Sequence, residues 1–164
     1  MKIVIADALP PSATDILVNE EWKVDARAGR PLDELMSDVE DADGLIVRSA
    51  TTVTAELIDA APRLRIIARA GTGVDNVDLD AASARGILVV NAPGANSISV
   101  AEHACALMLS LSRSVSLADA SMKAGRWEKQ TLQGAELRGK TLGLIGLGRI
   151  GREVARRARA FQMT

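Results

Sequence analysis

Three glycines, Gly146, Gly148 and Gly151, have the spacing in this chain that is most closely tied to a chemistry. They follow an apolar, strand-like run at 141–145 and lead into a helix-like segment at 152–161. In that context the first glycine permits a tight turn, the second lets backbone approach a diphosphate, and the third lets the helix pack close to its strand. Free N–H groups and the positive end of the helix dipole would then face the phosphates. The spacing predicts a dinucleotide site.

Two arginines stand where a second ligand would bind. Arg48 follows the apolar run 45–47, and Arg69 ends the run 66–68. Both are therefore expected at the carboxyl edge of a sheet, where α/β proteins bind ligands. A guanidinium donates two parallel hydrogen bonds to a phosphate or carboxylate. The alternative is that either arginine pairs with a nearby carboxylate and serves only the fold.

A glycine loop and an asparagine complete the candidate binding residues. Gly71 and Gly73 flank Thr72 directly after a strand, so backbone N–H groups could hold a carboxylate and the Thr72 hydroxyl could face a cofactor. A turn that needs only positive φ explains the glycines equally. Asn96 lies in a connector, where it would contact substrate, fix a hinge or simply form a turn.

The remaining reactive residues favour structural roles. His103 is the only histidine and has no nucleophile pattern to serve, and Cys105 falls on an apolar stripe. Asp75, Asn76 and Asp78 could suggest a cation, but capping of the next helix explains them with fewer assumptions. No metal site is predicted.

Composition excludes several classes of function. The 164 residues carry a formal net charge of −1, and aromatic residues make up 2% with no tyrosine. These values argue against nucleic-acid binding and against an anionic membrane surface. The sequence has no apolar run of the ~20 residues that a membrane span needs. Its amino-terminal apolar run is too short for a signal peptide, so a cytoplasmic protein is expected.

Aliphatic runs alternate with helical segments through the first half. Strands are predicted at 3–6, 22–24, 45–47, 66–68 and 87–90, with a helix after each of the first four. This alternation predicts a flavodoxin-like, doubly wound parallel sheet.

A single long helix is predicted from Ser99 to about Ala124, roughly 26 residues or 39 Å. Ser99 and Glu102 have capping-box spacing, and Gly125 offers a left-handed exit. Apolar residues lie on more than one face of this helix, which predicts burial by a second domain or by a twin subunit, hence a homodimer or homotetramer.

The predicted domains are residues 1–95, a hinge, helix and connector at 96–138, and a nucleotide-binding start at 139–164.

Several segments in order resemble one family. They are residues 47–51 (VRSAT), 69–78 (RAGTGVDNVD), 91–96, 100–102 (VAE) and 139–143 (GKTLG) followed by the glycine turn. Together they closely resemble the NAD-dependent D-2-hydroxyacid dehydrogenases. The resemblance covers nearly the whole chain, and residues 69–78 with 48–51 favour the branch that oxidises 3-phosphoglycerate for serine biosynthesis over formate or lactate relatives.

The resemblance implies a substrate domain, an inserted Rossmann domain and NAD as cofactor. It makes Arg48 the first candidate for the substrate phosphate and Arg69 the second, with Gly71 and Asn96 also facing substrate. It places Thr72, Gly146, Gly148, Arg149, Ile150 and Gly151 at the cofactor. The family's acid–base histidine, supporting glutamate and carboxylate-binding arginine are expected beyond position 164, so the chain alone is predicted to be inactive. The alternatives are a stand-alone dimerising or anion-binding α/β module, or a dehydrogenase for another D-2-hydroxy acid.

Overall fold

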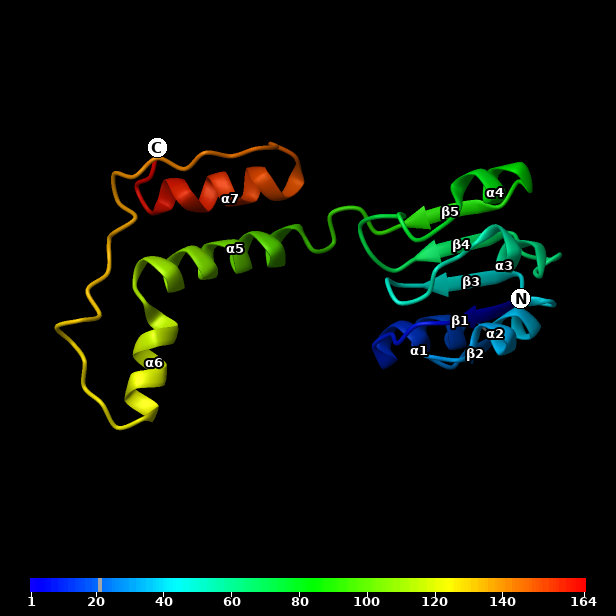
Figure 1. Cartoon of the computed structure of the whole chain (residues 1–164). Coiled ribbons are helices and arrows are strands. Elements are labelled where there is room, and N and C mark those ends of the chain that lie inside the picture. Colours follow the sequence, from blue (N-terminus) through cyan, green and yellow to red (C-terminus); the bar gives the residue numbers. More distant parts are fainter. Residues whose placement is uncertain (21) are drawn as a thin grey trace. The chain divides into compact units, whose positions relative to one another are not determined.

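The computed structural model describes residues 1–20 and 22–164 and divides into two compact units, Met1–Pro93 and Gly94–Thr164. In the first unit, five parallel strands form one sheet in the order β2-β1-β3-β4-β5 (Figure 1). This order is that of flavodoxin-like folds and confirms the predicted sheet. The strands are β1 (Lys2–Ile5), β2 (Lys23–Ala26), β3 (Gly44–Val47), β4 (Ile66–Arg69) and β5 (Leu88–Asn91).

Four helices connect these strands: α1 (Pro11–Asn19), α2 (Leu32–Val39), α3 (Ala55–Asp59) and α4 (Leu79–Ala84). The Thr54 hydroxyl accepts a hydrogen bond from Leu57 N at 3.3 Å, and the Asp78 carboxylate accepts one from Ala81 N at 2.9 Å. These two bonds cap the amino ends of α3 and α4. Because the central strands are covered on both faces, their aliphatic side chains form the core with α2 and α3. Its largest fully buried members are Ile5, Leu45, Leu57, Ile58, Ile67, Val4, Val39, Val47 and Val53.

An ion-pair cluster fixes the carboxyl ends of β1 and β2. The Arg30 side chain is only 3% exposed; its Nη1 lies 2.5 Å from Asp38 Oδ2 and 3.3 Å from Asp25 Oδ2. Its Nη2 donates to the carbonyl of Ile5 at 3.0 Å. Arg27 bonds the same two carboxylates from the exposed side. The hydrogen bond from Arg27 lowers the pKa of Asp25 to about 2, with burial opposing and the Arg30 charge assisting.

The predicted single long helix is wrong: the chain forms α5 (Ser97–Ser112) and α6 (Val115–Lys123) instead. Ser114 adopts φ 51° and ψ 36°, a left-handed conformation that ends α5. The carbonyl of Ser112, left free at the helix end, accepts a hydrogen bond from Ala135 N at 2.8 Å. The returning connector therefore stabilises the break. The predicted left-handed exit at Gly125 is present, with φ 71°.

Helix α7 (Arg149–Ala160) packs along α5 (Figure 1). Val154 and Ala158 are buried on α7, as are Ala101 and Cys105 on α5. An Arg157–Glu102 ion pair of 3.2 Å joins the two helices. The predicted capping box is wrong, because α5 begins at Ser97 and thereby places Ser99 and Glu102 inside the helix.

The predicted strand at 141–145 is not formed in the described part of the chain. Leu142 N donates to Thr164 O at 2.7 Å and Thr164 N donates to Lys140 O at 3.0 Å, the pattern of a parallel ladder. A strand needs a hydrogen-bonding neighbour along its length, and the described residues supply one only at this point. Ile145 is fully exposed.

The two units separate at Pro93–Gly94, and the finer division of residues 96–164 into a connector and a nucleotide-binding start stays a prediction. Across residues 1–20 and 22–164, none of the helices combines the length and apolar character that crossing a bilayer requires.

Candidate functional site

Arg48 and Arg69 lie at neighbouring strand ends of the first unit. In the parallel register Val47 of β3 is opposite Arg69 of β4, and Arg69 is opposite Asn91 of β5. Arg48 follows Val47 directly, so both arginines leave the sheet at its carboxyl edge. The structure thus brings two cations together with the loop at 70–73, on the edge where ligands bind in open α/β sheets.

The backbone around Arg48 is held by two side chains from other segments. The Asp7 carboxylate accepts hydrogen bonds from Arg48 N at 2.5 Å, from Thr51 N at 3.2 Å and from Thr51 Oγ1 at 2.6 Å. The Asn76 amide donates to Arg48 O at 2.7 Å and to Thr51 O at 2.5 Å. Arg48 itself is exposed, and its Nη1 donates to Ala8 O at 3.0 Å. Within residues 1–20 and 22–164 its other guanidinium N–H groups make no hydrogen bond, which leaves them available to an anionic ligand.

Asp7 is 6% exposed, and its pKa reflects two opposing effects. Burial raises the pKa of the carboxyl group, whereas hydrogen bonds from the Thr51 side chain and from the backbone N–H groups of Arg48, Thr51 and Ala50 lower it. The hydrogen bonds prevail, so the pKa lies below its ordinary value. Asp7 is therefore a buried carboxylate ion at neutral pH.

The Arg69 side chain lies across the loop in space that is free because residue 71 is glycine. A Cβ on Gly71 would lie 1.9 Å from Arg69 Nη1 and 2.7 Å from its Cζ, so the guanidinium occupies the space that any other residue would fill. The loop is tied to β5, since Ala92 N donates to Gly71 O at 2.8 Å and the Asn91 amide donates to Thr72 O at 2.7 Å. Arg69 Nε is buried and has no hydrogen-bond partner among the described residues. An anion beside the Arg69 guanidinium would suit this geometry.

The glycine turn of the second unit has the backbone geometry that its spacing predicts. Gly146 adopts φ 96°, which glycine tolerates best, and Gly148 is the N-cap of α7. A Cβ on Gly151 would lie 2.3 Å from Gly146 O, so the helix approaches the turn too closely for any side chain there. A Cβ on Gly148 would meet nothing within 4 Å in the described chain, which leaves open space beside the turn.

The first turn of α7 is positively charged. Arg149 and Ile150 begin the helix and are exposed, and Arg152 follows, with no acidic residue in the turn. Cations at the positive end of a helix dipole are unfavourable unless an anion sits beside them. Open space at Gly148, unpaired N–H groups and these arginines together fit a diphosphate.

The other predicted residues belong to the second unit. Asn96 is the N-cap of α5, and its carbonyl accepts a hydrogen bond from Val100 N at 2.9 Å, but its side chain makes no capping bond. His103 is exposed on α5, and Cys105 is buried where α7 packs on α5. The structure thus places Arg48, Arg69, Gly71 and Thr72 in one unit, and Asn96 and the glycine turn in the other.

The group Asp75, Asn76 and Asp78 does not act as one. Asp78 caps α4 as predicted, whereas Asn76 bonds the loop that carries Arg48. Among residues 1–20 and 22–164, no cluster of three His, Cys, Asp or Glu side chains could hold a metal ion.

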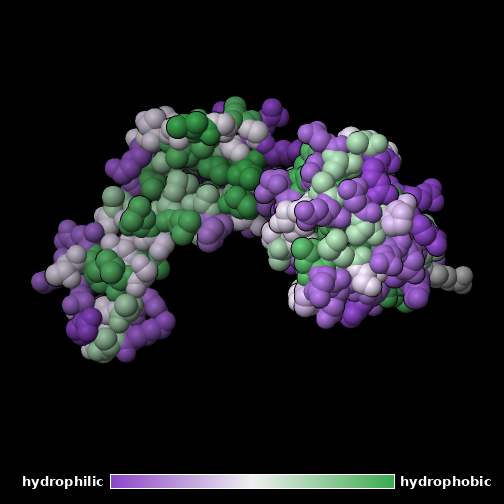
Figure 2. Space-filling view, turned by 45° about the vertical axis from the view of Figure 1, so that its right-hand side comes forward, coloured by the Kyte–Doolittle hydropathy of each residue, from purple (hydrophilic) through white to green (hydrophobic). Residues whose placement is uncertain are grey.

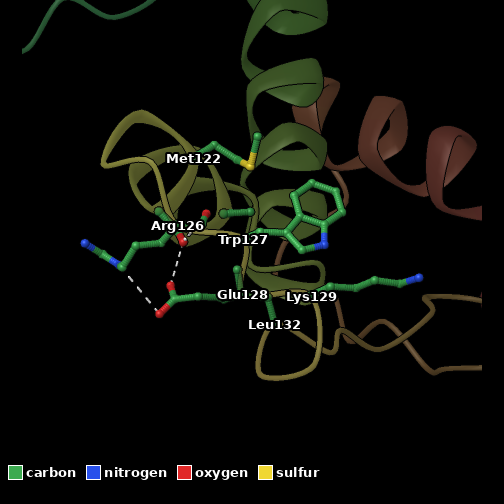
Figure 3. A pocket seen from close by; sticks show the side chains of 8 residues that line it. Met122, Arg126, Trp127, Glu128, Lys129 and Leu132 are labelled. Carbon is green, nitrogen blue, oxygen red and sulfur yellow. Dashed lines mark hydrogen bonds and ion pairs between the residues drawn. The ribbon is translucent and has the colours of Figure 1, made fainter.

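The hollow at the end of α6 is lined by none of the predicted residues. Figure 3 shows Met122 and Trp127 among its lining residues, with the Glu128 carboxylate turned toward Arg126. The Glu128–Arg126 ion pair measures 3.6 Å, and the buried Ser121 hydroxyl bonds Glu128 at 2.6 Å. These polar contacts fix the turn after α6. Trp127 is 77% exposed, so the hollow is an open surface feature rather than an enclosed pocket.

Sequence reasoning missed Asp7, Asn76 and Asn91 as part of the site. Asp7 had a usable signal, because it comes directly after a buried strand at the same edge as Arg48. The side-chain amides of Asn76 and Asn91 donate to backbone carbonyl groups of loops that are distant in sequence, and such contacts cannot be predicted from residue spacing.

Comparison with known proteins identifies a family. The family model for the D-isomer specific 2-hydroxyacid dehydrogenase catalytic domain matches residues 3–163. The chain therefore belongs to the D-isomer specific 2-hydroxyacid dehydrogenase family.

Among its relatives, the D-3-phosphoglycerate dehydrogenase of Homo sapiens is 51% identical over 162 residues, and that of Archaeoglobus fulgidus is 50% identical over 163. Each alignment covers 99% of this chain, which spans about 30% of the length of these relatives.

Solved structures of similar proteins share the fold. The TT0316 protein from Thermus thermophilus has a TM-score of 0.92 and 40% identity, covering 99% of this chain and 54% of that one. The NAD+-bound 3-phosphoglycerate dehydrogenase of Entamoeba histolytica has a TM-score of 0.78 and 32% identity, with 99% and 52% covered.

Proposed function

We propose that this chain supplies the substrate-binding unit and the start of the nucleotide-binding unit of an enzyme that oxidises 3-phospho-D-glycerate to 3-phosphohydroxypyruvate with NAD. The observation that carries the proposal is the pair Arg48 and Arg69 at adjacent strand ends, beside a loop closed onto β5. Identity of about half to several D-3-phosphoglycerate dehydrogenases supports this substrate over other D-2-hydroxy acids. The reaction would be the oxidative first step of serine biosynthesis.

In this proposal Arg48 binds the substrate phosphate and Arg69 is the second cation available to it. Gly71 keeps the space that Arg69 occupies, and the backbone N–H groups of Thr72 and Gly73 hold the carboxylate, since Gly71 N already donates to Arg69 O at 2.8 Å. Asn96, at the start of α5, is a further candidate for contact with the substrate. A substrate with a phosphate and a carboxylate group matches two guanidinium groups on one sheet edge, because each guanidinium forms charge-assisted hydrogen bonds.

NAD, when bound, supplies the acceptor for the hydride from the substrate's second carbon. On this chain the diphosphate would be held by backbone N–H groups from Gly148 to Gly151, and Arg149 would add positive charge. Ile150 would give the nucleotide an apolar contact, and Thr72 is a further candidate for contact with the cofactor. The open space at Gly148 and the close approach at Gly151 are what such a site requires.

The acid–base group of this reaction is not supplied by His103. That side chain is exposed on α5, and the sequence has no pattern of a nucleophile that it could serve. We expect the histidine, its supporting glutamate and a carboxylate-binding arginine to come from other residues of the full protein. The 164 residues alone are expected to be inactive.

We also propose a homodimer or homotetramer that buries α5 and α6. Figure 2 shows apolar residues gathered on the surface of the second unit. Leu107, Leu111 and Leu117 are 58%, 84% and 63% exposed, which is unusual for leucines on adjoining helices. Sedimentation of the full protein tests this: a monomer at micromolar concentration would contradict it.

The function is tested by steady-state kinetics of the protein expressed from its full reading frame. NADH formation should be seen with NAD and 3-phospho-D-glycerate, and kcat/KM should be at least ~100-fold lower with D-glycerate, since charge-assisted bonds to the phosphate are lost. D-lactate and formate serve as controls. Equal or higher kcat/KM with an unphosphorylated acid would assign the chain to another branch of the family.

A further inference from the structure

The loop from Arg48 to Thr51 is bound at both ends by two side chains that sequence analysis did not connect with it. Asp7 accepts the N–H groups of Arg48 and Thr51, and Asn76 donates to the carbonyl groups of the same two residues. All four backbone polar groups at the loop ends are therefore bonded to side chains.

The bonds of Asp7 are unusual because they leave a buried charge without a basic partner. Its hydrogen bonds within the described residues all come from the 48–51 loop, through backbone N–H groups and the Thr51 hydroxyl. Burying a carboxylate is costly unless several donors face it. Here the compensation comes entirely from one exposed loop, so the conformation of that loop and the charge of Asp7 depend on each other.

Asn76 is positioned by the segment that carries it. Val53 and Val77 form an isolated parallel bridge, with Val53 N donating to Asn76 O at 2.8 Å and Asp78 N donating to Val53 O at 2.9 Å. The bridge fixes the 76–78 segment against the chain just beyond Thr51. The Asn76 amide therefore reaches both carbonyl groups from a rigid base.

Resting on the proposed function, we propose that Asp7 and Asn76 are positioning residues for substrate selectivity: they hold the 48–51 loop so that Arg48 meets the phosphate of the substrate. Neither side chain touches the substrate in this account. Arg48 is exposed, so without Asp7 and Asn76 it would lose conformational freedom when the phosphate binds. Fixing its backbone on both sides, with Nη1 held by Ala8 O, leaves less of that freedom to be lost.

The test uses two isosteric variants of the full protein. Asp7→Asn removes the charge that faces the N–H groups, and Asn76→Asp replaces two donated bonds with a carboxylate against two carbonyl oxygens. Asp59→Asn, an exposed aspartate at the end of α3, is the control for loss of charge. Should Asp7→Asn not fold, Thr51→Val deletes only the hydroxyl bond of 2.6 Å, and Thr51→Ser should restore it.

The readout is the ratio of kcat/KM for 3-phospho-D-glycerate to that for D-glycerate. We expect each positioning variant to lower this ratio by about tenfold through KM, the effect of one weakened charge-assisted contact, with kcat nearly unchanged. In an Arg48→Ala background the same variants should have no further effect on the ratio, because the group they position is gone.

Three outcomes separate the two proposals. Equal losses for both substrates, or additive losses with Arg48→Ala, would show that Asp7 and Asn76 serve only the fold and would overturn their positioning role. An unchanged ratio in Asp7→Asn and Asn76→Asp, with a lowered ratio in Arg48→Ala, would also overturn it. If Arg48→Ala alone leaves the ratio unchanged, the proposed role of Arg48 fails first, and the positioning role fails with it.

Discussion

Replacing Gly148 and Gly151 separately by alanine distinguishes a ligand-facing glycine from a packing glycine. A Cβ on Gly151 would lie 2.3 Å from Gly146 O and 3.3 Å from Gly146 C, both backbone atoms. To reach ordinary contact the helix start must move by roughly 1 Å. A Cβ on Gly148 meets nothing within 4 Å of the described chain, so this substitution causes no steric clash in the free protein.

The magnitudes follow from competing effects. Overpacking costs about 1–3 kcal/mol, whereas alanine in place of glycine within a helix gains about 1 kcal/mol, so Gly151→Ala should lose up to ~2 kcal/mol of stability. The displaced N–H groups should also weaken dinucleotide binding by at least about tenfold. Gly148→Ala should cost under ~1 kcal/mol of stability as a changed N-cap, yet weaken binding by a similar factor, because its methyl group meets the diphosphate.

The assay is NADH titration by fluorescence together with thermal unfolding, on the full protein. The expected pattern is that Gly151→Ala clearly lowers both the unfolding temperature and the affinity, whereas Gly148→Ala lowers the affinity with at most a small change in unfolding temperature. Unaltered NADH affinity in Gly148→Ala would refute the placement of the diphosphate beside this turn. Unaltered stability and affinity in Gly151→Ala would refute the packing argument.

Three further substitutions test other contacts. Gly71→Ala should displace the Arg69 guanidinium, because its Nη1 lies 1.9 Å from the added methyl position. The weakened charged contact should raise KM for 3-phosphoglycerate by about 3–10-fold. A wild-type KM would show that Arg69 does not bind the substrate. Gly134→Ala places a methyl group 2.5 Å from Ser112 O, a backbone atom that cannot rotate away. The substitution should therefore lower the free energy of unfolding in urea by about 1–3 kcal/mol. A change below the error of the fit would count against the packing of the connector on the end of α5. Asp25 has its pKa lowered to about 2 in the folded state, so its stabilisation is present above its unfolded pKa of about 4 and is lost as pH falls toward 2. Asp25→Asn should therefore flatten the fall of the unfolding temperature between these pH values, and parallel curves for both proteins would contradict this.

The sheet could be predicted from the sequence because its signals are local. Near-continuous aliphatic runs mark strands covered on both faces, and Thr54 and Asp78 mark helix starts by bonds to residues three positions on. Gly86, with φ 66°, likewise marks the end of α4. Each of these signals is decided within a few residues, so tertiary packing does not overrule it.

The errors arose where distant segments decide the conformation. The apolar period continues through Ser114, but the connector residue Ala135 bonds the Ser112 carbonyl and stabilises the break between α5 and α6. Residues 141–145 have a strand's composition, yet the ladder needs partners that composition cannot reveal.

The candidate site divides in the same way. The glycine turn and the two strand-end arginines are visible in the sequence, because glycine spacing and strand ends are local features. The two side chains that hold the Arg48 loop, Asp7 and Asn76, could not be predicted in this way, since each bonds residues 25 or more positions away.

The most direct test of the account is the substrate selectivity of Arg48→Ala. Arg63→Ala is the matched control, since Arg63 is an exposed arginine before the amino end of β4 and pairs with Asp43 at 3.4 Å. In the full protein, kcat/KM for 3-phospho-D-glycerate relative to D-glycerate should fall by about 10–100-fold in Arg48→Ala, the loss of a charge-assisted contact, and stay at the wild-type value in Arg63→Ala. An undiminished preference for the phosphorylated acid in Arg48→Ala would contradict the assignment of this sheet edge as the phosphate site.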